Sequence, residues 1–414
     1  MADDGSVSTD DAREAPAHRY ARLDRATGSR AAPLAVVDLD AFDRNADALV
    51  ARAGGAPIRL ATKSVRCRHL IAAALERPGV EGLLAFSLRE ALWLAGTDVG
   101  GDILVAYPCV DVAALRELAA DARARERIAL VVDAPEHLGL IGSAVRAVAS
   151  GQRGPVRVWL DVDCSLRVAS AHLGARRSPL HTVSEVVAAA RAVAADPHVS
   201  LGGLMFYDAQ IAGLPDAGVA RLPVHLMQRV SAAELARRRG AILAAVREIV
   251  EVPAVNAGGT GSLHLMGGAA GVTEVAAGSG LFGPTLFDGY RAFAPEPAAC
   301  FALDVVRHPA PGFVTAFGGG YVASGAPGRS RLPTPVWPPG LRLLGSEGAG
   351  EVQTPLRVTG SGRGGVGPAI GSRVWLRHTK AGEMLERFGH VHLVRGERVV
   401  ATVPSYRGEG LDFG

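Results

Sequence analysis

Short apolar runs rich in β-branched residues alternate with Ala-, Leu- and Arg-rich stretches of helical spacing from about residue 33 onward. Strand and helix alternating every 20 to 50 residues or so is typical of parallel βαβ units. The clearest helical stretches are Asp111–Arg123, Pro135–Val148, Val183–Ala194 and His225–Glu251. The predicted strands are Leu34–Asp38, Ile58–Thr62, Gly82–Phe86, Asp102–Ala106, Ile128–Val132, Val156–Val162, Val199–Met205, Val252–Asn256 and Val272–Ala276.

Eight or nine such units predict a closed (β/α)8 TIM barrel over residues 31–295. An open doubly wound sheet is the alternative, but no Gly-x-Gly-x-x-Gly follows the first strand, which disfavours a dinucleotide site. Residues 1–30 are predicted to form a loosely ordered N-terminal arm. In residues 296–414 the helical spacing stops and Gly and Pro cluster between short strand-like runs, which predicts a C-terminal all-β domain.

Composition and charge exclude several classes of protein. The net charge of +3 is small for 414 residues and the cations are dispersed, so no nucleic-acid partner is expected. No apolar run is long enough to span a membrane, and the polar, acidic N-terminus is unlike a signal peptide. Four cysteines lie far apart and are predicted to be free thiols, as in a cytoplasmic protein: Cys67, Cys109, Cys164 and Cys300.

Only two of the 44 Lys and Arg residues are lysines, Lys63 and Lys380. Lysine can do what arginine cannot, because its amine can lose a proton and form a Schiff base with a carbonyl. Lys63 ends the second predicted strand, and barrel enzymes carry their catalytic groups at the C-terminal ends of strands. We therefore expect Lys63 to be catalytic, the alternative being an ordinary surface lysine.

Two glycine-rich loops follow the last two predicted strands. They are Asn256–Ser262 (NAGGTGS) and Gly278–Gly280 (GSG). Such loops let backbone N–H groups converge on an anion, and hydroxyls of Thr and Ser add donors. Barrel enzymes frequently bind phosphate with the loops after their last two strands. A reactive lysine and a phosphate cup together predict a pyridoxal 5′-phosphate site, whereas two plain turns are the alternative.

The order and spacing of these motifs resemble the fold-type III pyridoxal phosphate enzymes, which are alanine racemase-like barrels followed by a β domain. Within them the chain is most similar to the D-threonine aldolase and D-serine dehydratase branch, including a group described as amino acid deaminase/aldolase. The segments that carry the resemblance are VVDLD, IRLATKSVR, GLMFYDAQIAG, AGGTGS and TEVAAGSGLFGPTLFD.

The resemblance implies a role for each matching residue. Lys63 would hold pyridoxal phosphate as a Schiff base, Tyr207 would lie near its ring or phosphate, and Arg167 would face the pyridine, with Arg176 as the alternative. The family's aromatic residue after Gly-Ser is replaced here by glycine. The other cofactor-binding residues, most of them around the phosphate, would be Asn256, Gly258, Gly259, Thr260, Gly278, Ser279 and Gly280.

The metal position departs from the family pattern. In the resembling branch a C-terminal strand ends in His, one residue, then Cys or Asp, which together bind a divalent cation. Here the stretch is His378-Thr379-Lys380, and an ammonium cannot ligate a cation. The hypothesis is that Lys380 supplies the positive charge in place of a metal and that His378 is the acid/base on the substrate hydroxyl. The alternatives are a solvent-facing Lys380 in an altered site, or a divalent ion on His378 with Glu383 as a second ligand.

The resemblance implies a pyridoxal phosphate-dependent lyase that acts on D-β-hydroxy amino acids, by retro-aldol cleavage or by dehydration and deamination. Both reactions need a positive or acidic group at the hydroxyl, so the sequence leaves them open. An amino acid racemase is an alternative that needs a second base, for which Tyr321 or Tyr406 could be proposed. A pyridoxal phosphate-binding protein without catalysis is a third. The resemblance also implies a homodimer and a small D-amino acid as the substrate.

Overall fold

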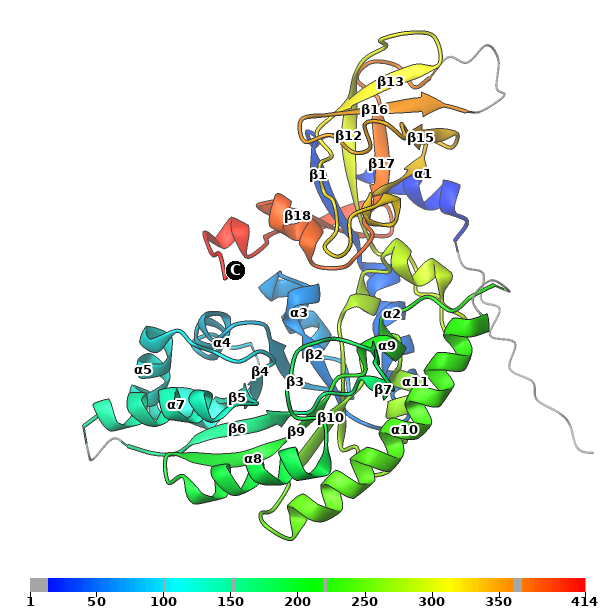
Figure 1. Cartoon of the computed structure of the whole chain (residues 1–414). Coiled ribbons are helices and arrows are strands. Elements are labelled where there is room, and N and C mark those ends of the chain that lie inside the picture. The colour runs from blue at the N-terminus through cyan, green and yellow to red at the C-terminus, as the bar shows by residue number, and fades with distance from the viewer. Residues whose placement is uncertain (1–13, 100, 150–152, 219–221, 360–366, 414) are drawn as a thin grey trace, which may run out of the picture. The chain divides into compact units, whose positions relative to one another are not determined.

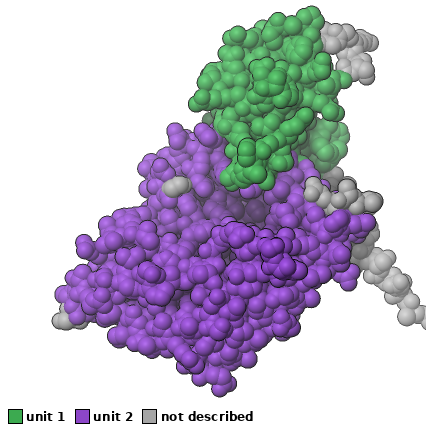
Figure 2. Space-filling view, viewed as in Figure 1, with its two compact units in different colours: residues 1–40, 299–379, 391–402 green, residues 41–298, 380–390, 403–414 purple. Residues whose placement is uncertain are grey.

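The computed structural model describes residues 14–99, 101–149, 153–218, 222–359 and 367–413 (Figure 1). The chain divides into two compact units that interleave along the sequence (Figure 2). Unit 1 comprises residues 1–40, 299–379 and 391–402. Unit 2 comprises residues 41–298, 380–390 and 403–414.

Unit 2 contains a closed barrel of eight parallel strands, which confirms the predicted TIM barrel. The strands are buried over most of their length, as in β5 (Ile128–Val132), because the barrel interior covers one face and helices cover the other. In barrel order the other strands are β6 (Val156–Asp161), β9 (Val199–Phe206), β10 (Ala254–Ala257), β11 (Glu274–Ala277), β2 (Ile58–Ala61), β3 (Val80–Ala85) and β4 (Ile103–Val105).

Four helices of the barrel, α4, α5, α6 and α8, begin at a residue whose side chain caps the helix. Ser87 accepts a hydrogen bond from the Glu90 N–H, and Thr182 forms a capping box with Glu185. These caps satisfy backbone donors that a helix start would otherwise leave unpaired. The helices are α2 (Leu39–Arg52), α3 (Arg68–Leu75), α4 (Leu88–Ala95), α5 (Val112–Ala120), α6 (Ala122–Arg127), α7 (Pro135–Ala147), α8 (Val183–Ala195), α9 (Ala209–Ala212), α10 (Leu222–Arg247) and α11 (Leu263–Met266).

A buried ionic network ties the barrel strands together. Arg59 on β2 donates to both carboxylate oxygens of Glu274 on β11, at 2.7 and 2.8 Å, and to Asp102 at 2.6 Å. Asn256 on β10 donates to Glu274 at 2.8 Å. Arg59 is buried, and these partners offset the free-energy cost of removing its charge from water.

Unit 1 is built on a nine-stranded sheet, so the predicted β structure after residue 296 is present. The predicted first barrel strand is instead part of this sheet: β1 (Leu34–Asp38) pairs antiparallel with β12 and parallel with β18. The other strands are β12 (Ala299–Arg307), β13 (Phe313–Phe317), β14 (Thr334–Trp337), β15 (Leu341–Leu343), β16 (Gln353–Val358), β17 (Arg373–Arg377), β18 (His390–Arg395) and β19 (Arg398–Pro404). A two-stranded hairpin, β7 (Leu166–Val168) with β8 (Ala171–Leu173), belongs to unit 2.

The N-terminal region differs from the predicted arm. Residues 1–13 lie outside the described residues, but Pro16–Ala26 form helix α1. Tyr20 and Leu23 of α1 are buried in one hydrophobic cluster with Trp375 of β17. This segment therefore packs as part of the unit 1 core, and unit 1 combines residues 1–40 with residues 299–379 and 391–402.

No helix within the described part of the chain is both long and apolar enough to cross a membrane. The four cysteines are free thiols, as predicted, and Cys67, Cys164 and Cys300 are buried. Burial raises the pKa of Cys67 to about 11, so its thiol stays protonated and unreactive.

Candidate active site

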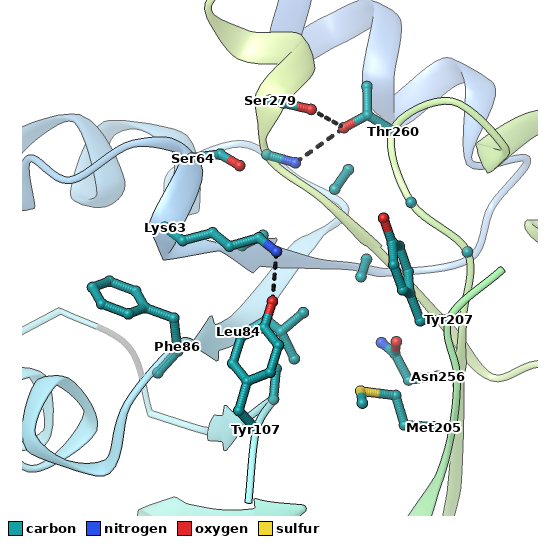
Figure 3. Close-up of a pocket in the computed structure, with 18 of the residues that line it drawn as sticks. Lys63, Ser64, Leu84, Phe86, Tyr107, Met205, Tyr207, Asn256, Thr260 and Ser279 are labelled. Atoms are coloured by element: carbon teal, nitrogen blue, oxygen red, sulfur yellow. Dashed lines mark hydrogen bonds between the residues drawn. The ribbon is translucent and has the colours of Figure 1, made fainter. Parts of the chain in front are cut away.

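A cavity opens at the C-terminal ends of the barrel strands, with about 680 Å³ of empty space including its solvent-filled mouth (Figure 3). Its wall is mostly apolar, with one lysine, one arginine and a few hydroxyl and amide groups. The lining residues are Ala61, Lys63, Ser64, Leu84, Ala85, Phe86, Ala106, Tyr107, Arg177, Met205, Tyr207, Asn256, Gly258, Gly259, Thr260, Ala276, Ala277, Gly278 and Ser279.

Lys63 points into this cavity from the end of β2. The strand stops at Ala61, and a single 3-10 turn over Thr62–Ser64 carries the lysine. The Nζ atom donates a hydrogen bond of 2.7 Å to the hydroxyl of Tyr107 (Figure 3). Lys63 thus lies at the C-terminal end of a barrel strand, where barrel enzymes carry their catalytic groups.

Tyr107 was not expected from the sequence. It comes just after β4, so its position behind a strand is the signal that could have indicated it. Burial on its own would raise the pKa of Tyr107, but the charge and hydrogen bond of Lys63 outweigh that effect and lower it. The tyrosine can therefore share a proton with the lysine more readily than a free phenol could.

Arg177 is the arginine that lines the cavity. Its guanidinium carbon lies 5.6 Å from the centroid of the Tyr107 ring and 5.2 Å from that of Tyr207. Tyr207 follows β9 and lines the cavity as expected, and burial raises the pKa of its hydroxyl. Together with Lys63 the arginine gives this apolar cavity two cationic groups, which favours an anionic ligand.

The structure places neither Arg167 nor Arg176 in the cavity. Arg167 lies on β7 and forms an ion pair of 2.6 Å with Asp163, and its side chain is 43% exposed. Arg167 and Arg176 line a separate open hollow beside the hairpin. Arg177, one residue further along the chain, takes the place in the cavity that the sequence reading gave to Arg167.

The two glycine-rich loops meet at the cavity, and the Gly278 loop lies next to the turn that carries Lys63. Thr260 accepts hydrogen bonds from the Gly278 N–H at 3.3 Å and from the Ser279 hydroxyl at 3.1 Å (Figure 3). Gly258 has a φ of +79°, and a Cβ on Gly278 would come within 2.7 Å of the Ala61 carbonyl oxygen. Glycine is therefore required for both the bend and the close approach.

Seven of the predicted cofactor residues besides Lys63 line the same cavity: Tyr207, Asn256, Gly258, Gly259, Thr260, Gly278 and Ser279. Gly280 does not line it, although it is buried behind Thr260 and Leu49. Hydroxyl groups and glycine backbone of the two loops line the cavity together with a lysine amine, which suits a ligand that carries both an anionic group and a carbonyl.

His378 and Lys380 do not line this cavity. His378 follows β17 in unit 1, whereas Lys380 belongs to unit 2. His378 is 2% exposed, and burial together with the charge of Arg377 lowers its pKa to about 3. Its ring is therefore neutral at neutral pH. Among the described residues, no group of three or more His, Cys, Asp and Glu side chains is placed to hold a metal ion.

The two tyrosines considered as a racemase base lie elsewhere. Tyr406 is buried in unit 2 and donates to Glu90 at 2.8 Å. Tyr321 belongs to unit 1, where its ring contacts Phe301 with 4.8 Å between the ring centroids. Neither tyrosine lines the cavity.

Unit 2 is thus a (β/α)8 barrel with a lysine after β2 and two glycine-rich loops after β10 and β11, the last two strands of the barrel along the chain. Residues 37–285 match the alanine racemase N-terminal domain family. The chain belongs to this family, which confirms the resemblance to the fold-type III pyridoxal phosphate enzymes. No curated protein sequence gives a match.

Several solved structures share the fold. D-threonine aldolase from Filomicrobium marinum has a TM-score of 0.75 at 21% identity, covering 91% of this chain and 95% of that one. D-threo-3-hydroxyaspartate dehydratase from Delftia sp. HT23 has a TM-score of 0.69 at 22% identity, covering 91% and 97%. Alanine racemase from Corynebacterium glutamicum has a TM-score of 0.55 at 18% identity, covering 83% and 88%. At these identities the likeness is one of fold.

Proposed function

We propose that this protein is a pyridoxal phosphate-dependent lyase that acts on D-amino acids carrying a β-hydroxyl group. One observation supports the proposal most directly: the Lys63 amine points into a cavity that is also lined by the glycine-rich loops after β10 and β11. The shared fold of a D-threonine aldolase and a D-threo-3-hydroxyaspartate dehydratase supports the choice of substrate class.

The residues of the cavity fit pyridoxal phosphate. Lys63 would form the covalent link to its aldehyde, and the Thr260 and Ser279 hydroxyls with the backbone of Gly259 would hold its phosphate. Added Cβ atoms at Gly278 or Gly258 would meet neighbouring atoms within 3.0 Å, so the cup is shaped by its glycines. When bound, the cofactor supplies an electron sink for the bonds at the substrate α-carbon.

Side chains of the cavity would bind the substrate, transfer protons and exclude water. Tyr107 would hold the freed Lys63 amine through the 2.7 Å hydrogen bond and exchange a proton with it. Arg177, fixed over two tyrosine rings, would bind an anionic group of the bound molecules. Phe86 and Leu84 would exclude water from the apolar side of the cavity.

Cleavage of Cα–Cβ and loss of the hydroxyl as water both require a group that acts on the β-hydroxyl. The pair expected from the sequence, His378 as acid/base and Lys380 as the positive charge, stays a prediction, because neither residue lines the cavity and His378 is buried. The solved structures of D-threo-3-hydroxyaspartate dehydratase include a cysteine variant in the metal-free form. Metal analysis of the purified protein tests the pair, because one tightly held divalent ion per chain would contradict it.

The central experiment is to record the visible spectrum of the purified protein with pyridoxal phosphate, reduce it with borohydride and map the adduct by mass spectrometry. Lys63 should carry the adduct, and Lys63→Ala should carry none. Lys380→Ala is the matched control, since it removes the other lysine and should leave the adduct in place. An adduct on Lys380, or none at all, would overturn the proposal.

Turnover then separates the reactions. D-serine, D-threonine and D-allo-threonine should be screened for aldehyde plus glycine, which marks an aldolase, and for an oxo acid plus ammonia, which marks a dehydratase. Conversion of D- to L-alanine would indicate a racemase instead, and bound cofactor without any turnover would indicate a binding protein. Light scattering tests the proposed homodimer.

A further inference from the structure

The backbone that carries Lys63 is covered by two segments from the end of the chain. We refer to residues 380–390 and 403–413 together as the C-terminal cover; both segments belong to unit 2 with the barrel. Gly382 has a φ of +96°, and a Cβ there would overlap the Lys63 carbonyl oxygen. The first segment of the C-terminal cover therefore lies directly against the backbone of the lysine.

Arg66 links the Lys63 turn to both segments of the C-terminal cover. Its Nε donates to the Lys63 carbonyl at 3.1 Å, and its guanidinium forms an ion pair with Glu386. Its own carbonyl accepts a hydrogen bond of 3.0 Å from the Tyr406 N–H. Arg66 has a φ of +50°, which a non-glycine residue rarely adopts, so these contacts hold a strained backbone next to the lysine.

Phe86, a second residue of the cavity wall, is held from behind in the same way. The Arg66 guanidinium carbon lies 4.8 Å from the centroid of its ring. Glu90 accepts hydrogen bonds of 2.8 Å from the Phe86 N–H and from the Tyr406 hydroxyl. Glu90 and Tyr406 are 0% and 1% exposed, so water does not compete for these bonds.

We infer that Arg66 and Glu90 are positioning residues for the Lys63 site and that the C-terminal cover holds them through Glu386 and Tyr406. The two residues touch the backbone of Lys63 and Phe86 and do not line the cavity themselves. That these residues serve catalysis rests on the proposed function. That the C-terminal cover keeps the lysine turn rigid is independent of that function.

The test is simple to read because the chain has only two lysines. An amine-reactive reagent applied to the full-length, cofactor-free protein can label Lys63, Lys380 and the N-terminus, and mass spectrometry follows the rate at Lys63 separately. Glu386→Gln and Tyr406→Phe should each raise that rate by roughly three- to tenfold, the change expected from losing one buried hydrogen bond or ion pair. Hydrogen exchange of residues 62–66 should accelerate in parallel.

The control variant is Glu409→Gln. It removes the 3.2 Å ion pair between Glu409 and Arg68, which ties the same C-terminal cover to α3 without contact to a cavity residue. This variant should leave the Lys63 rate unchanged. Equal rates in all three variants, each folded by circular dichroism, would overturn the inference.

Loading with pyridoxal phosphate gives a second readout. Glu386→Gln and Tyr406→Phe should release the cofactor faster than Glu409→Gln does. Because the labelling and exchange experiments need no cofactor, failure of the wild-type protein to form the Lys63 adduct would refute the proposed function and leave the test of the C-terminal cover intact.

Discussion

Replacing Glu90 by glutamine should change how the stability of this protein depends on pH. Glu90 is fully buried, and burial is the main cause that raises its pKa from 4.5 to about 7. Between those values the folded protein keeps its carboxyl protonated while the unfolded chain releases the proton. The folded state therefore binds more protons in this window, and stability is lost as the pH rises through it.

The pKa difference sets the size of the effect. At about 1.4 kcal/mol for each pKa unit, Glu90 costs the folded protein about 3 kcal/mol at pH 8 relative to pH 4.5. Glutamine is neutral at every pH, and it can still accept from the Phe86 N–H while its amide meets the Tyr406 hydroxyl.

The assay is urea unfolding of the wild type and of Glu90→Gln at several pH values between 4.5 and 8. Burial also raises the pKa values of Asp161 and Asp208 to about 7, but both residues are present in both proteins. The difference between the two stability curves therefore isolates Glu90 and should grow by about 3 kcal/mol in favour of the variant. Parallel curves would refute the reasoning.

Three further substitutions have defined outcomes. Gly382→Ala should lower the free energy of unfolding by about 2–4 kcal/mol, measured by thermal melting, because its Cβ meets the Lys63 carbonyl at a positive φ. Glu274→Ala should cost about 3–5 kcal/mol in urea unfolding, because it leaves Arg59 buried with one fewer partner, and an unchanged midpoint would contradict this. Tyr107→Phe should lower kcat/KM by roughly 10²-fold with the cofactor still bound, and full activity would exclude it from proton transfer.

The eight barrel strands could be predicted because each is a short apolar run followed by a helical stretch. The strand at Leu34–Asp38 has the same local pattern and could not be distinguished from them. All five of its residues are buried, in the middle of the unit 1 sheet between β12 and β18. A central sheet strand and a barrel strand bury both faces alike, so only long-range pairing separates the two.

Part of the site was also visible in the sequence. A lysine directly after one barrel strand and glycine-rich loops after two others are typical of ligand-binding sites in barrel enzymes. The choice among neighbouring arginines depended on a hairpin that the sequence did not indicate. In it Arg167 pairs with His172, and the chain then returns so that Arg177 lines the cavity. Tyr107 gave no signal beyond its place after β4.

The interleaving of the two units has a consequence for when the site is completed. The eight barrel strands and Lys63 are all synthesised by residue 277, whereas the residues that cover the lysine turn follow only from residue 380 onward. A nascent or truncated chain that ends before residue 380 would present its amine on an uncovered loop. The lysine turn therefore acquires these contacts only after residues 380–390 and 403–413 have been synthesised.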